Sequence, residues 1–190
     1  VVLRKLTSEV STSTDYELAK QVQDIFHNGD YFRDYTSTDI IGAEMGASLK
    51  NVIALASGIL AGLGYGDNAR AALITRGLVE MTRLSVAVGA QSKTLLGLTG
   101  IGDLIVTCTS VHSRNFQAGV KIGSGKNLEE TLNSMTMVVE GARSAKAAYQ
   151  LAEDLKIEIP LIKATYDIIY NHVSPKIIIS KLMNRDLKPE

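Results

Sequence analysis

The sequence has a single cysteine, no excess of charge of either sign and no long apolar run. One cysteine, Cys108, excludes an intrachain disulfide and is typical of a reducing compartment, so we expect a cytoplasmic protein. The 20 basic and 20 acidic side chains cancel. A chain without net charge has no overall field to attract nucleic acid or an anionic membrane, so neither is expected as a partner.

No apolar stretch approaches the ~18–20 residues that cross a bilayer. The apolar start Val1-Val2-Leu3 is short and precedes its basic residues, which argues against a signal peptide. The first residue is not methionine, so we expect the natural start to lie upstream. With 190 residues, 45% of them apolar, the chain can bury the core of one large domain, or of one domain and a fragment.

Residues 1–38 predict a strand, a helix and a second strand. Val1-Val2-Leu3 is prone to form a strand, and the segment from Tyr31 to Tyr35 is aromatic and alternating. Asp15 is a candidate N-cap for a helix between them, whose apolar face contains Leu18, Val22, Ile25 and Phe26. Two short strands do not make a stable sheet alone, so we expect this unit to be the remnant of a larger sheet.

Residues 39–190 predict an all-helical domain of about seven helices. Capping residues, prolines at helix starts and helical spacing of small and apolar residues all contribute to this prediction. The expected boundaries are Asp39 to about Ala61, Asp67 to about Ala87 with Gly89 as a stop, Asn127 to Leu132, Gly141 to Leu155, and two helices that begin at Pro160 and Pro175.

Small residues recur at steps of four on the stripe of the first long helix that contains Lys50; they are Gly42, Gly46, Ala54 and Gly58. Glycine inside a helix costs about 0.5–1 kcal/mol relative to alanine, so we expect something to approach the backbone closely. One interpretation is a packing seam against another helix, with Lys50 reaching water. The other is that Lys50, followed by the amide Asn51, faces a ligand.

Two other segments are candidates for ligand contact. Three glycines precede a carboxylate between Gly97 and Asp103, which indicates either a tight loop that meets a small polar ligand or a helix–helix turn capped by Asp103. Ser113-Arg114-Asn115 opens a predicted helix through Lys121. Free N–H groups, the helix dipole and a guanidinium fork at such a start favour a phosphate. The alternative is a solvated arginine after an ordinary cap.

Three features are interpreted as structural. Cys108 is expected to be a buried thiol, because only His112 lies near it in sequence. The segment Gly62-Leu-Gly64-Tyr-Gly66 looks like a dinucleotide-binding loop, but a helix precedes it, so a helix–helix turn is expected. The histidines lack the spacing of metal ligands, and no metal is expected.

Together, a series of ordered segments closely resembles the bacterial type of NAD(P)-dependent glycerol-3-phosphate dehydrogenase. These segments are Phe32 to Tyr35, Asp39 to Gly42, Leu49 to Ala54, Asn68 to Met81, Gly97 to Leu104, Thr107 to Ser110, Ser113 to Asn115 and Val138 to Gly141. The resemblance implies a mainly α chain, with a 6-phosphogluconate-dehydrogenase-like all-helical C-terminal domain after the β-α-β end of a Rossmann domain. It also implies interconversion of sn-glycerol 3-phosphate and dihydroxyacetone phosphate with NAD or NADP, by a cytoplasmic homodimer that supplies phospholipid synthesis.

The resemblance assigns roles to individual residues. Lys50 is expected to take the proton when the alcohol is oxidised, and to polarise the ketone in the reverse direction. The residues expected to bind substrate are Lys50, Asp103, Ser113, Arg114 and Asn115, and those expected to contact the cofactor are Arg114, Val138 and Glu140. Asn51 and Thr107 match positions that line the pocket in the eukaryotic branch of the family.

The family's glycine-rich nucleotide loop and a second substrate-contacting lysine are expected upstream of Val1, so this chain alone is expected to be inactive. Two alternatives stay open. One is a different dehydrogenase with a helical second domain that acts on a sugar acid or keto acid. The other is a non-catalytic helical interaction or dimerisation module. Convergence of Lys50, Asp103 and Arg114 on one pocket favours the enzyme, and their dispersal over the surface favours the module.

Overall fold

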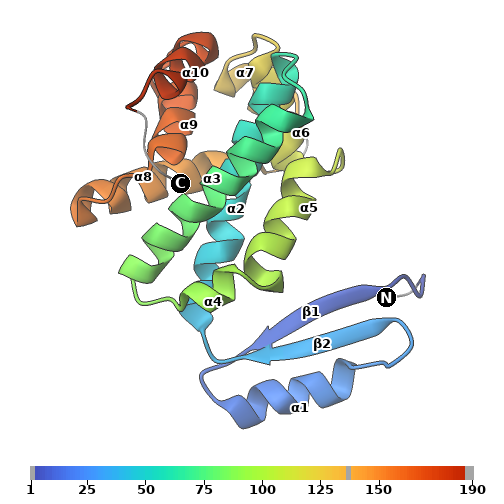
Figure 1. Cartoon of the computed structure of the whole chain (residues 1–190). Coiled ribbons are helices and arrows are strands. Elements are labelled where there is room, and N and C mark those ends of the chain that lie inside the picture. Colours follow the sequence, from blue (N-terminus) through green and yellow to red (C-terminus); the bar gives the residue numbers. More distant parts are fainter. Residues whose placement is uncertain (1–2, 136–137, 187–190) are drawn as a thin grey trace.

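The computed structural model describes residues 3–135 and 138–186. Its elements are β1 (Thr7–Thr12), α1 (Tyr16–Phe26), β2 (Phe32–Ser37), α2 (Ile40–Gly62), α3 (Asp67–Ala87), α4 (Ser92–Leu95), the π-helical turn η1 (Leu98–Gly102), α5 (Asp103–Thr109), α6 (Arg114–Gly123), α7 (Leu128–Asn133), α8 (Glu140–Leu155), α9 (Pro160–Tyr170) and α10 (Pro175–Met183). The β-α-β unit lies at one end of the molecule and the remaining helices cluster at the other (Figure 1). The expected mainly α architecture is confirmed.

The two strands are parallel, with Thr7 opposite Phe32 and Thr12 opposite Ser37. Asp34 on β2 is buried and accepts hydrogen bonds from the main-chain N–H and the hydroxyl of Ser11 on β1, which fixes this register. The first strand was predicted too early. Val1 and Val2 lie outside the described residues, and Leu3 is in an exposed turn. Pairing with β2 decides the position of the strand, and local β-propensity does not override it.

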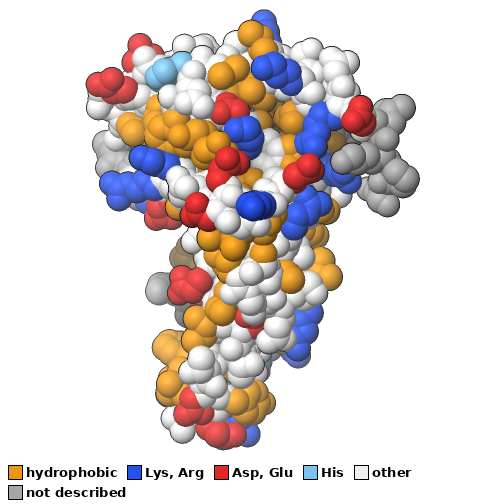
Figure 2. Space-filling model, turned by 90° about the vertical axis from the view of Figure 1, so that its left-hand side faces the viewer, with side chains coloured by type: hydrophobic (Ala, Val, Ile, Leu, Met, Phe, Trp, Pro, Cys, Tyr) orange, Lys and Arg blue, Asp and Glu red, His pale blue; other side chains and the backbone are white. Residues whose placement is uncertain are grey.

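Helix α1 begins at the predicted cap, because the Asp15 carboxylate accepts the N–H groups of Glu17 and Leu18. Its apolar face is largely exposed, with Leu18, Ile25 and Phe26 all at least half accessible to solvent. Apolar side chains also lie on the surface of the narrow part of the molecule that contains this unit (Figure 2). Helix α1 therefore packs on the sheet through few of its residues.

Helix α2 is the centre of the helical cluster and packs against α3, α5, α6 and α8. Its side chains from Leu49 to Ile59, with the exception of Lys50, are buried. By length and mean hydropathy, 1.3 over its most apolar window, α2 also meets the criterion for a membrane span. Glu44 and Lys50 interrupt the apolar run in α2, so its residues did not predict a membrane span. Burial within the core accounts for the apolar composition, since 56% of that window is inside the protein.

Helices α2 and α6 approach at a glycine seam, formed by Gly58 and Gly62 on α2 and by Gly119 and Gly123 on α6. A Cβ atom on Gly58 would overlap the carbonyl oxygen of Phe116, and one on Gly119 would overlap the carbonyl oxygen of Leu55. The two backbones are thus in direct contact. Of the glycines on the small-residue stripe, Gly58 packs in this seam, whereas Gly42 faces the side chains of Asp39 and Thr94 and Gly46 faces the carbonyl oxygen of Thr99. The interpretation of the stripe as a packing seam against a helix is therefore confirmed at Gly58.

Most predicted helix boundaries are confirmed, including the Asp39 cap of α2, the start of α7 at Asn127 and the proline starts of α9 and α10. Gly89 ends α3 with a φ of 103°, and the 62–66 glycine segment is a helix–helix turn. The prediction that Asp67 caps α3 was wrong. Gly66 is the N-cap, and Asp67 is the first helical residue and pairs with Arg70. The described residues also contain nine α-helices from α2 to α10, more than the seven expected, because the 92–109 segment folds into short turns.

Candidate functional site

Lys50 on α2 and Asp103 at the start of α5 form an ion pair in which the ammonium Nζ donates to the carboxylate Oδ2. The two side chains are 20% and 39% exposed, so the pair lies at the edge of the core with one side open to solvent. Thr107, one turn further along α5, donates its hydroxyl to the carbonyl oxygen of Asp103 at 2.6 Å. The simpler interpretation of the stripe, in which Lys50 extends freely into water, is therefore wrong.

The glycine-rich segment before Asp103 is a compact turn. Gly97 precedes η1, and a Cβ atom on Gly100 would overlap the main chain of Leu95. Helix α5 follows at once, and its N-cap is Gly102, without a side-chain cap. Asp103 is therefore not a cap, and its carboxylate is directed to Lys50 instead. The segment positions this carboxylate and does not form an open loop.

Helix α6 begins at Ser113, whose hydroxyl accepts the N–H of Phe116 at 3.3 Å, as predicted for an N-cap. The first-turn N–H groups of Arg114 and Asn115 have no hydrogen-bond partner among the described residues. The Arg114 guanidinium lies 3.8 Å from the carboxylate of Glu140, and both side chains are about half exposed. Free N–H groups, a helix dipole and a guanidinium occur together at this position.

A second cluster surrounds Asn51, the residue after Lys50. Asn51 donates through Nδ2 to Glu140 at 3.2 Å and accepts through Oδ1 from Asn115 at 2.9 Å. Asn115 also accepts the main-chain N–H of Gly141 at 2.8 Å. Consecutive residues of α2 thus connect the Lys50–Asp103 pair to the Asn51 cluster, which includes Arg114 through its pair with Glu140. The predicted polar residues thus form two groups that α2 joins, Lys50 with Asp103 on α5 and Asn51 with the residues on α6 and α8.

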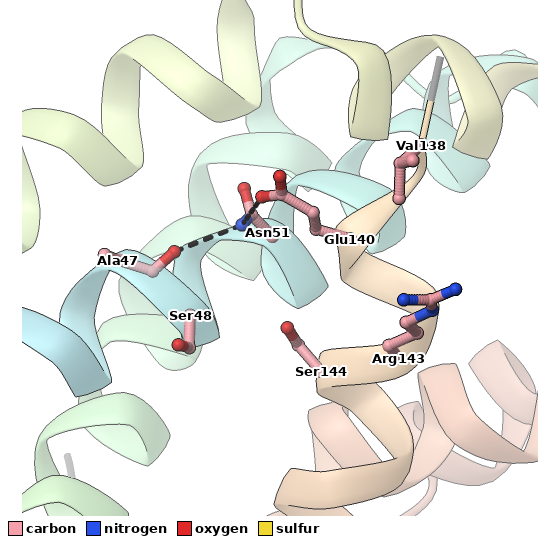
Figure 3. A pocket seen from close by; sticks show the side chains of 7 residues that line it. All are labelled: Ala47, Ser48, Asn51, Val138, Glu140, Arg143 and Ser144. Carbon is pink, nitrogen blue, oxygen red and sulfur yellow. Dashed lines mark hydrogen bonds between the residues drawn. The ribbon is translucent and has the colours of Figure 1, made fainter. Parts of the chain in front are cut away.

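An open pocket of about 350 Å³ lies beside this region, between α2 and the start of α8 (Figure 3). Its lining residues are Ala47, Ser48, Asn51, Val138, Glu140, Arg143 and Ser144. Val138, a predicted cofactor contact, is 57% exposed at its edge. Sequence reasoning missed Arg143 and Ser144. Arg143 and Ser144 lie three and four residues after Glu140, which places them on the same helical face. This helical spacing is the sequence signal that could have identified them as pocket residues.

Cys108 is fully buried in α5, and burial raises the pKa of its thiol to about 12. Its carbonyl oxygen accepts the hydroxyl of Ser57 at 3.0 Å, which ties α5 to α2. The prediction of a structural thiol is confirmed. Among the residues that the structure describes, no group of three or more His, Cys, Asp and Glu side chains is arranged to hold a metal ion.

Curated relatives match the whole chain. The glycerol-3-phosphate dehydrogenase [NAD(P)+] of Geobacillus kaustophilus is 56% identical over all 190 residues, which correspond to 55% of its length. That of Lactiplantibacillus plantarum is 52% identical over the same residues, 56% of its length. The chain therefore spans about half the length of the curated relatives it matches.

A solved structure and a family model give the same result. The crystal structure of glycerol-3-phosphate dehydrogenase from Coxiella burnetii superimposes with a TM-score of 0.91 at 37% identity, covering 96% of this chain and 56% of that one. The model described as NAD-dependent glycerol-3-phosphate dehydrogenase C-terminus matches residues 39–180. The chain belongs to the family of NAD-dependent glycerol-3-phosphate dehydrogenases, as the part that corresponds to their C-terminal region.

Proposed function

We propose that the chain is the substrate-binding part of an NAD(P)-dependent enzyme that interconverts sn-glycerol 3-phosphate and dihydroxyacetone phosphate. Residues 39–190 form the substrate-binding domain and residues 1–38 the end of a nucleotide-binding domain. The observation that carries the proposal is the link between the Lys50–Asp103 pair and the start of α6 with its arginine, made by Asn51, which follows Lys50 and accepts from Asn115. A basic side chain and an anion-binding helix start are the two groups that this phosphorylated alcohol requires.

Lys50 acts as the acid–base residue. Oxidation of the secondary alcohol removes a hydride from carbon and a proton from the hydroxyl, and the neutral Lys50 amine accepts that proton. In the reverse direction the Lys50 ammonium polarises the ketone and protonates the alkoxide. The Asp103 carboxylate, held by Thr107, orients the Lys50 side chain. Helix α2 is rigid at this point because the residues around Lys50 are packed in the core.

The phosphate of the substrate binds at the start of α6. The Arg114 guanidinium offers a planar fork that suits two phosphate oxygens, and the first-turn N–H groups of Arg114 and Asn115 add hydrogen bonds. Ser113 shapes this turn as its cap. Binding the remote phosphate fixes the reacting carbon near Lys50, which is how positioning contributes to the rate.

The cofactor lies against the start of α8. The exposed apolar side chain of Val138 suits one face of a nicotinamide ring, and the carboxylate of Glu140 suits its carboxamide. Arg114 lies next to Glu140 and contacts both ligands in this proposal. NAD or NADP, when bound, accepts or supplies the hydride. The cytoplasm is the proposed location, supported by the single buried cysteine, and a homodimer is the proposed assembly, supported by the resemblance.

The test is turnover of dihydroxyacetone phosphate with NADH or NADPH by the full-length protein, followed by cofactor absorbance. We expect activity in the full-length protein and none in the 190-residue chain, because hydride transfer requires the two reacting carbons to be held ~3–3.5 Å apart. Turnover of a sugar acid in place of the phosphorylated ketone would support the other dehydrogenase. Absence of any turnover would support the interaction module.

A further inference from the structure

The connection between α1 and β2 contains the only Asn-Gly pair of the sequence, Asn28-Gly29. Both residues are exposed, and their loop joins the end of α1 to the start of β2 (Figure 1). The residues of the candidate functional site all lie later in the chain, from α2 onward. In an Asn-Gly pair the main-chain nitrogen of the second residue approaches the side-chain amide of the first with little hindrance, because glycine has no side chain. Whether the two groups react depends on how the loop holds them.

The side-chain carbonyl of Asn28 is turned toward the main chain that follows it. Its Oδ1 accepts the N–H of Asp30 at 3.0 Å, in a turn that asparagine commonly forms with the residue two positions on. This hydrogen bond polarises the amide carbonyl and stabilises negative charge that develops on Oδ1 during attack at the carbon. The amide nitrogen Nδ2 of Asn28 has no hydrogen-bond partner among the described residues. The amide is therefore activated at its oxygen and unrestrained at the nitrogen that would leave.

The main-chain nitrogen of Gly29 is the neighbouring nucleophile. Within the part of the chain that the structure describes, its N–H makes no hydrogen bond. The N–H groups on either side are engaged, since Asn28 donates to Phe32 at 2.8 Å and Asp30 donates to the Asn28 side chain. A Cβ atom on Gly29 would meet nothing within 4 Å, so the loop is open at this point. Attack by this nitrogen is intramolecular and has the advantage of proximity.

Asn133, the last residue of α7, differs from Asn28 in the nitrogen that follows it. It is also exposed and also precedes a small residue, Ser134. The N–H of Ser134, however, donates to the carbonyl oxygens of Glu130 and Thr131, both at 3.2 Å. Attack by this nitrogen would break the hydrogen bonds that close the last turn of the helix. Exposure does not distinguish the two asparagines, whereas the state of the next main-chain nitrogen does.

We propose that Asn28 is a deamidation site, at which the Gly29 nitrogen attacks the side-chain amide carbon and closes a succinimide ring. The bond from the Gly29 nitrogen to Cγ of Asn28 forms, the bond from Cγ to Nδ2 breaks, and Nδ2 leaves as ammonia with the proton of Gly29. Water then opens the ring at either carbonyl. Opening at Cγ gives aspartate, and opening at the main-chain carbon gives isoaspartate, in which the chain continues through Cγ. Neither step requires an oxidant or a reductant.

The isoaspartate product alters the start of β2. Asn28 and Phe32 exchange two main-chain hydrogen bonds, at 2.8 and 3.0 Å, and Phe32 is the buried first residue of β2. Isoaspartate inserts an additional carbon into the main chain before Gly29, and the carbonyl that accepted the N–H of Phe32 becomes a free carboxylate. The loop then no longer matches the geometry of this bridge, so the start of β2 loosens. The aspartate product leaves the main chain, and therefore the bridge, unchanged.

The experiment incubates the full-length protein in mildly alkaline buffer and follows its asparagine peptides by mass spectrometry, which detects the mass gained when an amide becomes an acid. We expect most of the Asn28 peptide to be converted before conversion of Asn133 is detected, with isoaspartate among the products. Gly29→Ala should keep residue 28 largely intact over the same period, because a methyl group hinders the attacking nitrogen. The added Cβ atom has room, so this variant is expected to fold. Asn28→Gln, whose longer side chain must close a larger ring, should also stay intact.

Amide hydrogen exchange at residues 31–33 tests the effect on β2. Exchange should increase in the incubated wild type and stay at its initial level in freshly prepared Asn28→Asp, which has the aspartate product without the isoaspartate. Unchanged exchange in protein that contains isoaspartate would contradict the loosening of β2.

The site itself would be overturned by an intact Asn28 or by equal conversion of Asn28 and Asn133. Undiminished conversion in Gly29→Ala would also overturn it, as would aspartate as the sole product, because direct attack by water on the amide gives aspartate alone. None of these readouts measures turnover, so the proposal stands or falls independently of the proposed function.

Discussion

Lys50 donates a hydrogen bond to Asp103, a residue 53 positions further along the chain, and this contact joins α2 to α5 at the edge of the core. A lysine with a carboxylate partner on one side can still present its remaining donor positions to a ligand on the other. The pair therefore accounts for both features of the site, an oriented side chain and an accessible ammonium.

Lys50→Met should lower kcat of the full-length enzyme by roughly 10²–10⁴-fold, the usual contribution of a positioned acid–base group, while cofactor KM changes little. Steady-state kinetics with dihydroxyacetone phosphate measures both. Lys126→Met, which removes an exposed lysine from the loop before α7, is the matched control. A variant that keeps more than about a third of the wild-type kcat would rule out Lys50 as the proton-transfer residue.

Arg114→Lys should raise KM for dihydroxyacetone phosphate by roughly 10–150-fold, because a point charge replaces the planar fork and one charge-assisted hydrogen bond is lost. The weak activity toward unphosphorylated dihydroxyacetone should hardly change, since that molecule has no phosphate. Thermal stability should hold, because Arg114 is about half exposed. Equal losses with both substrates would show that Arg114 acts only through the cofactor or the fold and does not bind the phosphate.

The titration of Glu80 should make the stability of the protein depend on pH. This carboxylate is buried on α3 and accepts the N–H groups of Leu161 and Ile162 at the start of α9. Burial raises the pKa of Glu80 to about 7, although those hydrogen bonds act in the opposite direction. An acid whose pKa is raised on folding keeps its proton longer in the folded state. Its contribution to stability is therefore complete below about pH 4.5 and is lost as the pH rises to about 7.

The measurement compares melting temperatures of the wild type and Glu80→Gln from pH 5 to pH 8. The wild type should lose stability across this range, and the variant, which has no proton to release at this position, should lose less. The amide oxygen of the introduced glutamine can still accept from the start of α9, so the variant is expected to fold. Identical pH profiles would show that Glu80 does not titrate in this window.

Gly119→Ala should destabilise the protein by about 1–3 kcal/mol, the typical cost of inserting a methyl group into a packed core. The added Cβ atom would overlap the carbonyl oxygen of Leu55, so α2 and α6 must move apart. Gly29→Ala is the control, because a Cβ atom there meets nothing within 4 Å. Denaturant titration of both variants gives the free energies of unfolding. A neutral Gly119→Ala would mean that the glycine seam is not tightly packed.

Local signals in the sequence predicted most of the helices. Caps such as Asp15, Asp39, Ser113 and Asn127 act on N–H groups within three residues, so their effect is visible in a short window. Contacts between residues far apart in the sequence are not visible in such a window. The position of β1 depends on pairing with β2, 25 positions later in the register, and a β-prone start at Val1 could not reveal it.

The sequence suggested residues for the candidate site, but it did not suggest their hydrogen-bond partners. Spacing alone left Lys50 and Asp103 with two interpretations each, and the resemblance was needed to choose between them. The hydrogen bonds of the Asn115 side chain to Asn51 and Gly141 depend on partners 64 and 26 positions away. Glu80 is a similar case, because it caps a helix that begins 80 residues later. Contacts of this kind arise from the tertiary arrangement of helices and leave no local pattern.

The glycine seam between α2 and α6 gives the proposed site a fixed length scale. Lys50 belongs to one of these helices and the proposed phosphate-binding turn at Arg114 to the other, and the backbones touch without intervening side chains. Rotamer changes in the seam therefore cannot alter the spacing of the two backbones. The seam therefore fixes the distance between the two ends of the proposed site. A molecule with one carbon more or fewer between its reacting centre and its phosphate is expected to engage one end and miss the other.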